Sequence, residues 1–257
     1  MSYFDAILLG IVQGLTEFLP VSSSGHLVLV QELLGVKQAG VAFELLAHLG
    51  TLVAVLIYFR RTIWRLVLAA LGKGSRDDRR MVLWLIVGTV PAGVAGYLLQ
   101  DFFKQAFSNP LVTSCMLFVT GVILLGTRFV RRGDRPISFV SALVMGIGQA
   151  VAIMPGISRS GATIASGLFA GVRPSQAAEF SFLLSIPAIA GATLLEAPEI
   201  LSVSSELMAP YLLGSLFSLV FGLVAVYVVL ETIKRGKFDY FAYYCFAAGA
   251  LGVYLFL

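Results

Sequence analysis

The sequence predicts an all-α polytopic membrane protein with six full transmembrane helices and two re-entrant helical hairpins, in two inverted-topology repeats. Hydrophobic residues make up 58% of the 257 residues and charged residues 12%, about half the charged share of a soluble protein. Several apolar runs approach the roughly 20 residues that cross a bilayer, which favours a helical bundle over a barrel. Two shorter apolar segments are interrupted by proline, glycine and serine at matching places in the two halves, as in transporters built from inverted repeats.

The first interrupted segment is QGLTEFLPVSSSGH, residues 13–26. Gln13 and Glu17 share one helix face, and Pro20 disfavours helical geometry at the residue before it, so the first helix should end there. Ser22–Gly25, the first serine turn, offers N-cap residues for a second helix that we expect to begin near His26. Free N–H groups at such a start form an anion site. Ionisable groups at membrane depth indicate a functional site.

A shift of 136 residues aligns this segment with MGIGQAVAIMPGISRSGAT in the second half. Gln149 then matches Gln13, and Ser158–Gly161, the second serine turn, matches Ser22–Gly25, with Arg159 in the place of Ser23. The alignment predicts two repeats, residues 1–135 and 136–257, within one membrane domain.

Each repeat should contain one hairpin and three spans. The helices 3–19, 26–35, 138–153 and 161–171 are too short to cross a bilayer and should pair into the hairpins 3–35 and 138–171. The predicted spans are 41–59, 81–99, 111–130, 175–195, 209–230 and 238–257.

Loop charges predict the orientation. Lysine and arginine number seven in the loop 60–80, four in 128–135 and three in 234–237, whereas 100–110 and 196–208 are mainly acidic. By the positive-inside rule the basic loops are cytoplasmic, so both termini should lie outside and the two serine turns should meet near mid-bilayer. The arginines are thus topology signals with some affinity for anionic lipid, and they indicate no nucleic acid partner. The sequence contains no evident signal peptide, so the first helix should remain in the protein.

Arg159 is the strongest candidate for a functional residue, because it is the only strongly basic residue predicted at membrane depth. It could form a structural ion pair with Glu17 or Glu179, but a guanidinium between two serines at a helix start suits phosphate, and we favour that role. Glu17 could cap the serines, and His26 could bond a carbonyl, yet their clustering indicates function. Glu44 and His48 share a helix face, for which we favour a structural role.

Metal and nucleotide sites have little support in the sequence. The two histidines and the apolar Cys115 and Cys245 lack zinc-ligand spacing, and no Walker-type glycine loop is present.

QGLTEFLPVSSSGH and PGISRSGAT closely resemble the two signature regions of the undecaprenyl-pyrophosphate phosphatases, the bacitracin-resistance membrane family. The resemblance implies hydrolysis of a long-chain prenyl pyrophosphate to the lipid monophosphate and phosphate, on the outer face of the bacterial plasma membrane. This reaction recycles the carrier for peptidoglycan synthesis. The first position of the first motif holds either glutamate or glutamine in the family, and Gln13 of this chain is the less acidic variant.

The implied chemistry assigns roles to the residues of both turns. Arg159 and helix N–H groups would hold the pyrophosphate, Ser23 would attack phosphorus, and Glu17 and His26 would move its proton. His26 as the nucleophile stays open. Substrate-binding candidates are Gln13, Ser22, Ser24, Gly25, Ser158, Ser160 and Gly161. No cofactor is required, although a divalent cation, Mg²⁺ or Ca²⁺, bridging Glu17 and the phosphates stays open. The sequence does not give the oligomeric state.

Two alternatives compete with this interpretation. Lipid phosphatases of the acid-phosphatase superfamily also use Ser-Gly-His and Ser-Arg elements, but their later histidine and aspartate have no counterpart after Arg159. A lipid flippase or transporter would also be built from inverted repeats with broken helices. Phosphate release by the purified protein would distinguish an enzyme from a transporter.

Overall fold

The computed structural model describes residues 1–36, 40–107 and 109–257. Within these ranges the chain is helical, and its only extended pairing is an isolated bridge between Arg135 and Val172. The helices of the first half are α1 (Tyr3–Phe18), α2 (Ser23–Leu34), α3 (Gly40–Tyr58), α4 (Arg60–Ala70), α5 (Arg76–Leu98), α6 (Gln100–Phe107), α7 (Pro110–Gly126) and the 3₁₀ turn η1 (Thr127–Phe129). Those of the second half are α8 (Phe139–Val151), α9 (Arg159–Phe169), α10 (Pro174–Leu195), α11 (Ala197–Leu201), α12 (Ser205–Lys234) and α13 (Tyr240–Phe256).

The helices have the lengths and composition of a polytopic membrane protein. In the described part of the chain, four segments are long and apolar enough to cross a bilayer: α5, α7 with η1, α10 and α12. The bent pair formed by α3 and α4 would make a fifth, and α8 and α13 are shorter apolar helices. The predicted all-α membrane class is therefore confirmed.

The basic segment after the first predicted span, expected to be a loop, instead contains a helix. The chain bends by 83° after Tyr58 and continues as α4, and α5 then begins at Arg76, five residues before the predicted start of that span. Leu66 and Ala69 are buried on one side of α4, which explains why a segment rich in arginine is helical here. The side chain of Ser75 accepts a hydrogen bond from the Asp78 N–H (3.0 Å) and caps α5.

Several other predicted boundaries are also corrected. The helix expected near His26 begins at Ser23, and the helix expected from residue 161 begins at Arg159, because Ser22 and Ser158 are their caps. The predicted loops 100–110 and 196–208 contain the short helices α6 and α11, while Ser108 lies outside the described residues.

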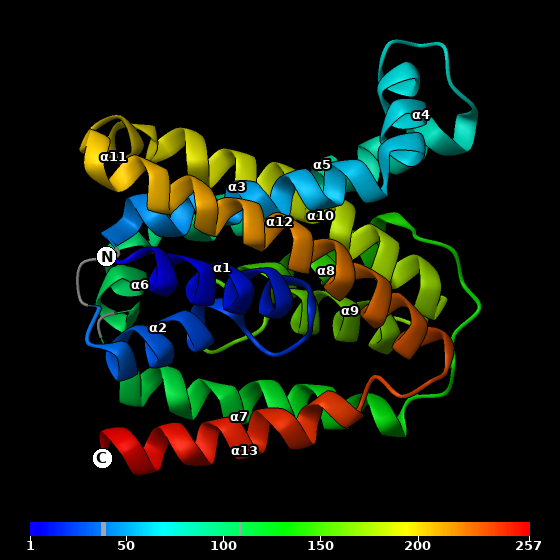
Figure 1. Ribbon diagram of the computed structural model, residues 1–257. Coiled ribbons are helices and arrows are strands. Elements are labelled where there is room, and N and C mark those ends of the chain that lie inside the picture. Colours follow the sequence, from blue (N-terminus) through cyan, green and yellow to red (C-terminus); the bar gives the residue numbers. More distant parts are fainter. Residues whose placement is uncertain (37–39, 108) are drawn as a thin grey trace.

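Helix α1 lies at the centre of the molecule, between α2 and α12 (Figure 1). Two glycines permit this position, because a Cβ added at Gly10 would lie 2.2 Å from the carbonyl oxygen of Gly214, and one at Gly14 would lie 2.6 Å from that of Ser218. The backbones of α1 and α12 thus pack directly on each other, as small residues allow in membrane helices. This packing places the carboxyl end of α1, which carries Glu17, inside the bundle.

The elements at the two ends of the bundle differ in charge. Figure 1 shows both chain termini, α6 and α11 at the left end, and α4 and the turns after α7 and α12 at the right end. The right end therefore contains the three segments with the most arginine and lysine.

Candidate functional site

The two serine turns make the same set of hydrogen bonds. Ser22 Oγ accepts from the Gly25 N–H (3.3 Å), as Ser158 Oγ does from the Gly161 N–H (3.1 Å). The serine hydroxyls two residues apart also contact each other, at 3.3 Å between Ser22 and Ser24 and 3.2 Å between Ser158 and Ser160. The turns differ at the cap itself, because Ser22 has a φ of 70°, in the left-handed region, whereas Ser158 has a φ of −71°.

The turns also contact one another. Ser160 Oγ donates to the carbonyl oxygen of Leu19 (3.2 Å), at the break that follows α1. A Cβ added at Gly161 would lie 3.2 Å from Pro20 Cβ, and one at Gly25 would lie 3.3 Å from Gly156 Cα. The absence of side chains at these two positions therefore allows the segments to approach closely.

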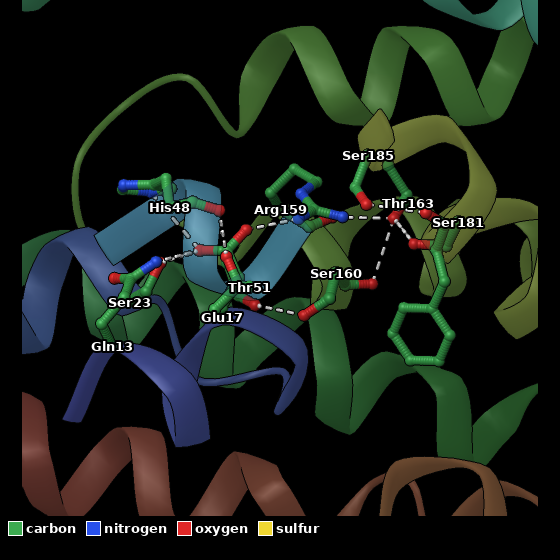
Figure 2. Close-up of polar contacts among 12 residues, drawn as sticks. Gln13, Glu17, Ser23, His48, Thr51, Arg159, Ser160, Thr163, Ser181 and Ser185 are labelled. Carbon is green, nitrogen blue, oxygen red and sulfur yellow. Dashed lines mark hydrogen bonds and ion pairs between the residues drawn. The ribbon is translucent and has the colours of Figure 1, made fainter. Parts of the chain in front are cut away.

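Glu17 is the centre of the site that the two turns enclose (Figure 2). Its Oε2 atom accepts hydrogen bonds from Gln13 Nε2 (3.0 Å) and from Ser23 Oγ (2.7 Å). Its Oε1 atom accepts from the guanidinium of Arg159 in the second turn. Only 7% of Glu17 is exposed, so its charge requires these partners. A single carboxylate thus connects the hydroxyl of the first turn to the arginine of the second.

Arg159 forms one of the two ion pairs that the sequence allowed. It pairs with Glu17, while Glu179 accepts a hydrogen bond from Thr62 Oγ1 (3.3 Å). The second terminal nitrogen of Arg159, Nη1, is buried and has no hydrogen-bond partner among the described residues. An unpaired buried donor is costly, and a guanidinium is well shaped for phosphate oxygens. Arg159 therefore has a donor for an anionic ligand in addition to its bond with Glu17.

A cavity of about 330 Å³ opens beside this pair. Its polar lining contains Glu17, Arg159 and all three serines of the first turn, together with Ser158. Its apolar lining comes partly from α10, where Ala188, Ile189 and Ala192 follow Pro187, a proline inside the helix. Polar groups at one side and an apolar wall at another suit a ligand that has a charged head and a hydrocarbon tail.

The structure adds two side chains from α3, and one from the residue between α10 and α11, to the site. His48 Nε2 lies 3.5 Å from Glu17 Oε2, and its Nδ1 is 2.7 Å from the carbonyl oxygen of Glu44. Glu44, which accepts a hydrogen bond from Gln31 Nε2 (3.2 Å), and Glu196 also line the cavity. The i, i+4 spacing of Glu44 and His48 was visible in the sequence, but only the packing of α3 against α1 brings His48 to Glu17.

His26 lies apart from the carboxylate. Its Nδ1 is 2.8 Å from the carbonyl oxygen of Ser22, and its Nε2 is 2.8 Å from the hydroxyl of Tyr244 in α13, on which its ring stacks. Both ring nitrogens thus have partners, and none of the contacts of His26 in the described part of the chain is with Glu17, Ser23 or Arg159. The prediction that His26 belongs with Glu17 and Ser23 rested only on its closeness to them in the sequence.

Gln13 and its counterpart Gln149 are both buried, at 0% and 2% exposed. Gln13 donates to Glu17, whereas the side-chain amide of Gln149 has no hydrogen-bond partner among the described residues. Over the same residues, no group of three or more His, Cys, Asp or Glu side chains is arranged to hold a metal ion. A divalent cation at Glu17 would have to take most of its ligands from substrate phosphates and water.

The fold and the site define a helical membrane protein in which a carboxylate, an arginine and serine hydroxyls lie together where the break between α1 and α2 meets the start of α9. Residues 6–251 match the family model of the bacitracin resistance protein BacA, and the chain belongs to this family. It is 42% identical to an undecaprenyl-diphosphatase of Salinibacter ruber, with 99% of this chain and 100% of the relative covered. It is 41% identical to one of Korarchaeum cryptofilum (97% and 97%) and 43% identical to one of Syntrophotalea carbinolica (98% and 98%), relatives that carry the same name.

Proposed function

We propose that this protein is a membrane-embedded undecaprenyl-diphosphatase, which hydrolyses undecaprenyl pyrophosphate to undecaprenyl phosphate and inorganic phosphate. This activity recycles the lipid carrier of cell-wall synthesis and gives resistance to bacitracin. The full-length similarity to relatives of this name supports the activity. The observation that carries the assignment to a site is the Glu17 carboxylate, which bonds the Ser23 hydroxyl with one oxygen and Arg159 with the other.

In the first step, Ser23 Oγ attacks the terminal phosphorus of the pyrophosphate. Its proton passes to Glu17 Oε2, 2.7 Å away, and the bond from phosphorus to the bridging oxygen breaks, which releases the lipid monophosphate. Arg159 and the N–H groups at the start of α9 and α2 bind the non-bridging oxygens and stabilise their charge in the transition state. The pocket for the phosphates is shaped by four further serine hydroxyls and two glycines: Ser22, Ser24, Ser158, Ser160, Gly25 and Gly161.

In the second step, water attacks the phosphoserine and inorganic phosphate leaves. Glu17, which has by then passed the first proton to the departing lipid monophosphate, takes a proton from this water and returns it to the Ser23 oxygen as the bond from that oxygen to phosphorus breaks, which restores the resting site. Besides Ser23, His48 can exchange a proton with this carboxylate, because its Nε2 atom lies 3.5 Å from Glu17 Oε2. The amide of Gln13 cannot do so. His26 holds the first serine turn from behind through Ser22 and Tyr244.

The proposed membrane arrangement follows the predicted repeats, residues 1–135 and 136–257. In it, α1 with α2 and α8 with α9 are re-entrant hairpins that enter from opposite sides, and six spans surround them. The arrangement places both termini outside the bacterial plasma membrane and opens the cavity outward. The charge difference between the two ends of the bundle supports this orientation, because the basic segments share one end (Figure 1).

Phosphate release from undecaprenyl pyrophosphate by the purified protein in detergent tests the function. We expect the wild type to release one phosphate per lipid and Glu17→Gln to release almost none, because the amide cannot accept the serine proton. If the wild type bound the lipid without releasing phosphate, the enzyme assignment would be wrong and a transporter would be the better description.

A further inference from the structure

A second hollow lies at the basic end of the bundle, and it shares no lining residue with the candidate site. Its volume is about 540 Å³, within the range of small-ligand pockets. Side chains from the segment after α7 and from the start of α13 dominate its wall, and we call it the basic hollow. Its polar and aromatic lining consists mainly of Arg128, Arg131, Arg132, Asp239, Tyr240 and Tyr243.

The charges of the basic hollow are unbalanced. Three guanidinium groups face it, and Asp239 is the one carboxylate among its lining residues in the described part of the chain. Arg128 donates to the hydroxyl of Tyr243 (3.4 Å). Within the described residues, the side chains of Arg131 and Arg132 have no hydrogen bond or ion pair with the rest of the protein. Like charges gathered in one concave site repel each other unless an anion joins them.

One of these arginines lies against the backbone. A Cβ added at Gly236, which has a φ of +70° in the turn between α12 and α13, would lie 1.8 Å from the Nη2 atom of Arg132. The glycine therefore permits both the left-handed turn and the close approach of the guanidinium. Arg132 is thus packed beside the hollow even though much of its side chain is exposed.

The position and lining of the hollow indicate the kind of anion. It lies where α7 with η1 and α12 end and where α10 begins, and all three are candidate spans, so it is at the level of lipid headgroups. Ile233 and Phe238, both at least 96% buried, line it on its inner side. The exposed rings of Tyr240 and Tyr243 also line it, as aromatic residues do at membrane interfaces.

We propose that the basic hollow binds the phosphate headgroup of an anionic phospholipid. The guanidinium groups of Arg131 and Arg132 bind the phosphate oxygens, and the acyl chains leave past the aromatic rings into the bilayer. Free inorganic phosphate has the same oxygens but would gain nothing from the apolar inner wall and the position at the membrane surface.

Native mass spectrometry of the purified protein in detergent, titrated with phosphatidylglycerol, tests the proposal. We expect the wild type to bind phosphatidylglycerol in preference to phosphatidylcholine. Arg131→Gln with Arg132→Gln should weaken this binding about thirty-fold, at about 1 kcal/mol for each arginine lost. The control, Arg61→Gln with Arg79→Gln, removes two exposed arginines of the basic segment 60–80, which does not line the hollow, and should leave the affinity unchanged.

Three results would overturn the proposal. Equal losses in the two double variants would mean diffuse attraction to surface charge, and equal binding of the two lipids would mean no headgroup recognition. Displacement of phosphatidylglycerol by an equal concentration of inorganic phosphate would assign the hollow to the free anion.

Phosphate release by each variant reports its folding, since no substituted residue belongs to the candidate site. If the double variant were inactive, Arg132→Lys, which keeps the charge and loses the planar fork, should still weaken binding several-fold.

Discussion

At the scale of single residues, the site depends on how many partners Glu17 has. Four side chains from four helices, Gln13, Ser23, His48 and Arg159, lie within 3.5 Å of its two oxygens. The carboxylate therefore positions both the proposed nucleophile and the proposed phosphate ligand before any substrate binds, which is the preorganisation that transition-state stabilisation needs.

Ser23→Ala should reduce turnover by about 10³-fold or more and leave folding intact. The cap of α2 is made by Ser22, so the substitution removes the nucleophile and one hydrogen bond to Glu17, which keeps its bonds from Gln13 and Arg159. Ser24→Ala is the matched control and should cost far less. Rapid acid quenching should trap acid-stable phosphate on wild-type Ser23. Acid-labile phosphate on His26, or substantial turnover by Ser23→Ala, would instead make histidine or water the nucleophile.

Arg159→Ala should abolish hydrolysis, with a loss of about 10³-fold or more, because the transferring phosphoryl group loses its charge-assisted ligand. Arg159→Lys should restore little, since an ammonium cannot replace both the donor to Glu17 and the buried Nη1 donor. Phosphate release and thermal unfolding in detergent should be measured together. Near-normal turnover by a well-folded alanine variant would contradict the assignment and leave Arg159 as a structural partner of Glu17.

At the scale of elements, the sequence predicted the broken helices better than the helix ends. Pro20 and the serine caps give local signals that do not depend on packing, and these locate the break after α1 and the break before α9. Helix α4 gave no such signal, because seven basic residues in the segment 60–80 suggested a loop while burial of Leu66 and Ala69 stabilises a helix. The contact of His48 with Glu17 and the wall from α10 arise from tertiary packing, which periodicity does not contain.

Gly10→Ala should destabilise the protein by about 1–3 kcal/mol, because the new methyl group would overlap the carbonyl of Gly214 and force α1 away from α12. Gly93→Ala is the control, since a Cβ there has nothing within 4 Å and replaces a glycine inside α5. It should be neutral or stabilise the helix by up to about 1 kcal/mol. Thermal unfolding in one detergent measures both. Equal melting temperatures for the wild type and Gly10→Ala would show that the close helix contact tolerates a methyl group.

At the scale of the whole molecule, the serine turns are joined from opposite halves of the chain. Glu17 and Arg159 are 142 positions apart and Leu19 and Ser160 are 141 apart, yet both pairs are bonded. The halves therefore complete one site between them, and neither half contains both the proposed nucleophile and the proposed phosphate ligand. The orientation of this site in the membrane decides which face of the cell supplies its substrate.

Cysteine labelling tests that orientation. In a background without Cys115 and Cys245, Ser2→Cys and Ser204→Cys should react with an impermeant thiol reagent added to intact spheroplasts. Ser75→Cys, in the basic segment between α4 and α5, should react only after the membrane is opened. Labelling of position 75 from outside, or protection of position 204 in intact spheroplasts, would reverse the proposed topology.

The bond between Glu17 and Arg159 has a consequence for product inhibition. A phosphate that binds both terminal nitrogens of Arg159 must displace from one of them a carboxylate that belongs to the same protein and is present at a high effective concentration. The pyrophosphate headgroup, with more negative charge than inorganic phosphate, competes better, so turnover continues in phosphate-rich surroundings and the product leaves readily. Glu17→Gln removes this tethered competitor. The variant should bind inorganic phosphate more tightly than the wild type while releasing almost none from the lipid, a gain that phosphate-dependent thermal stabilisation would measure.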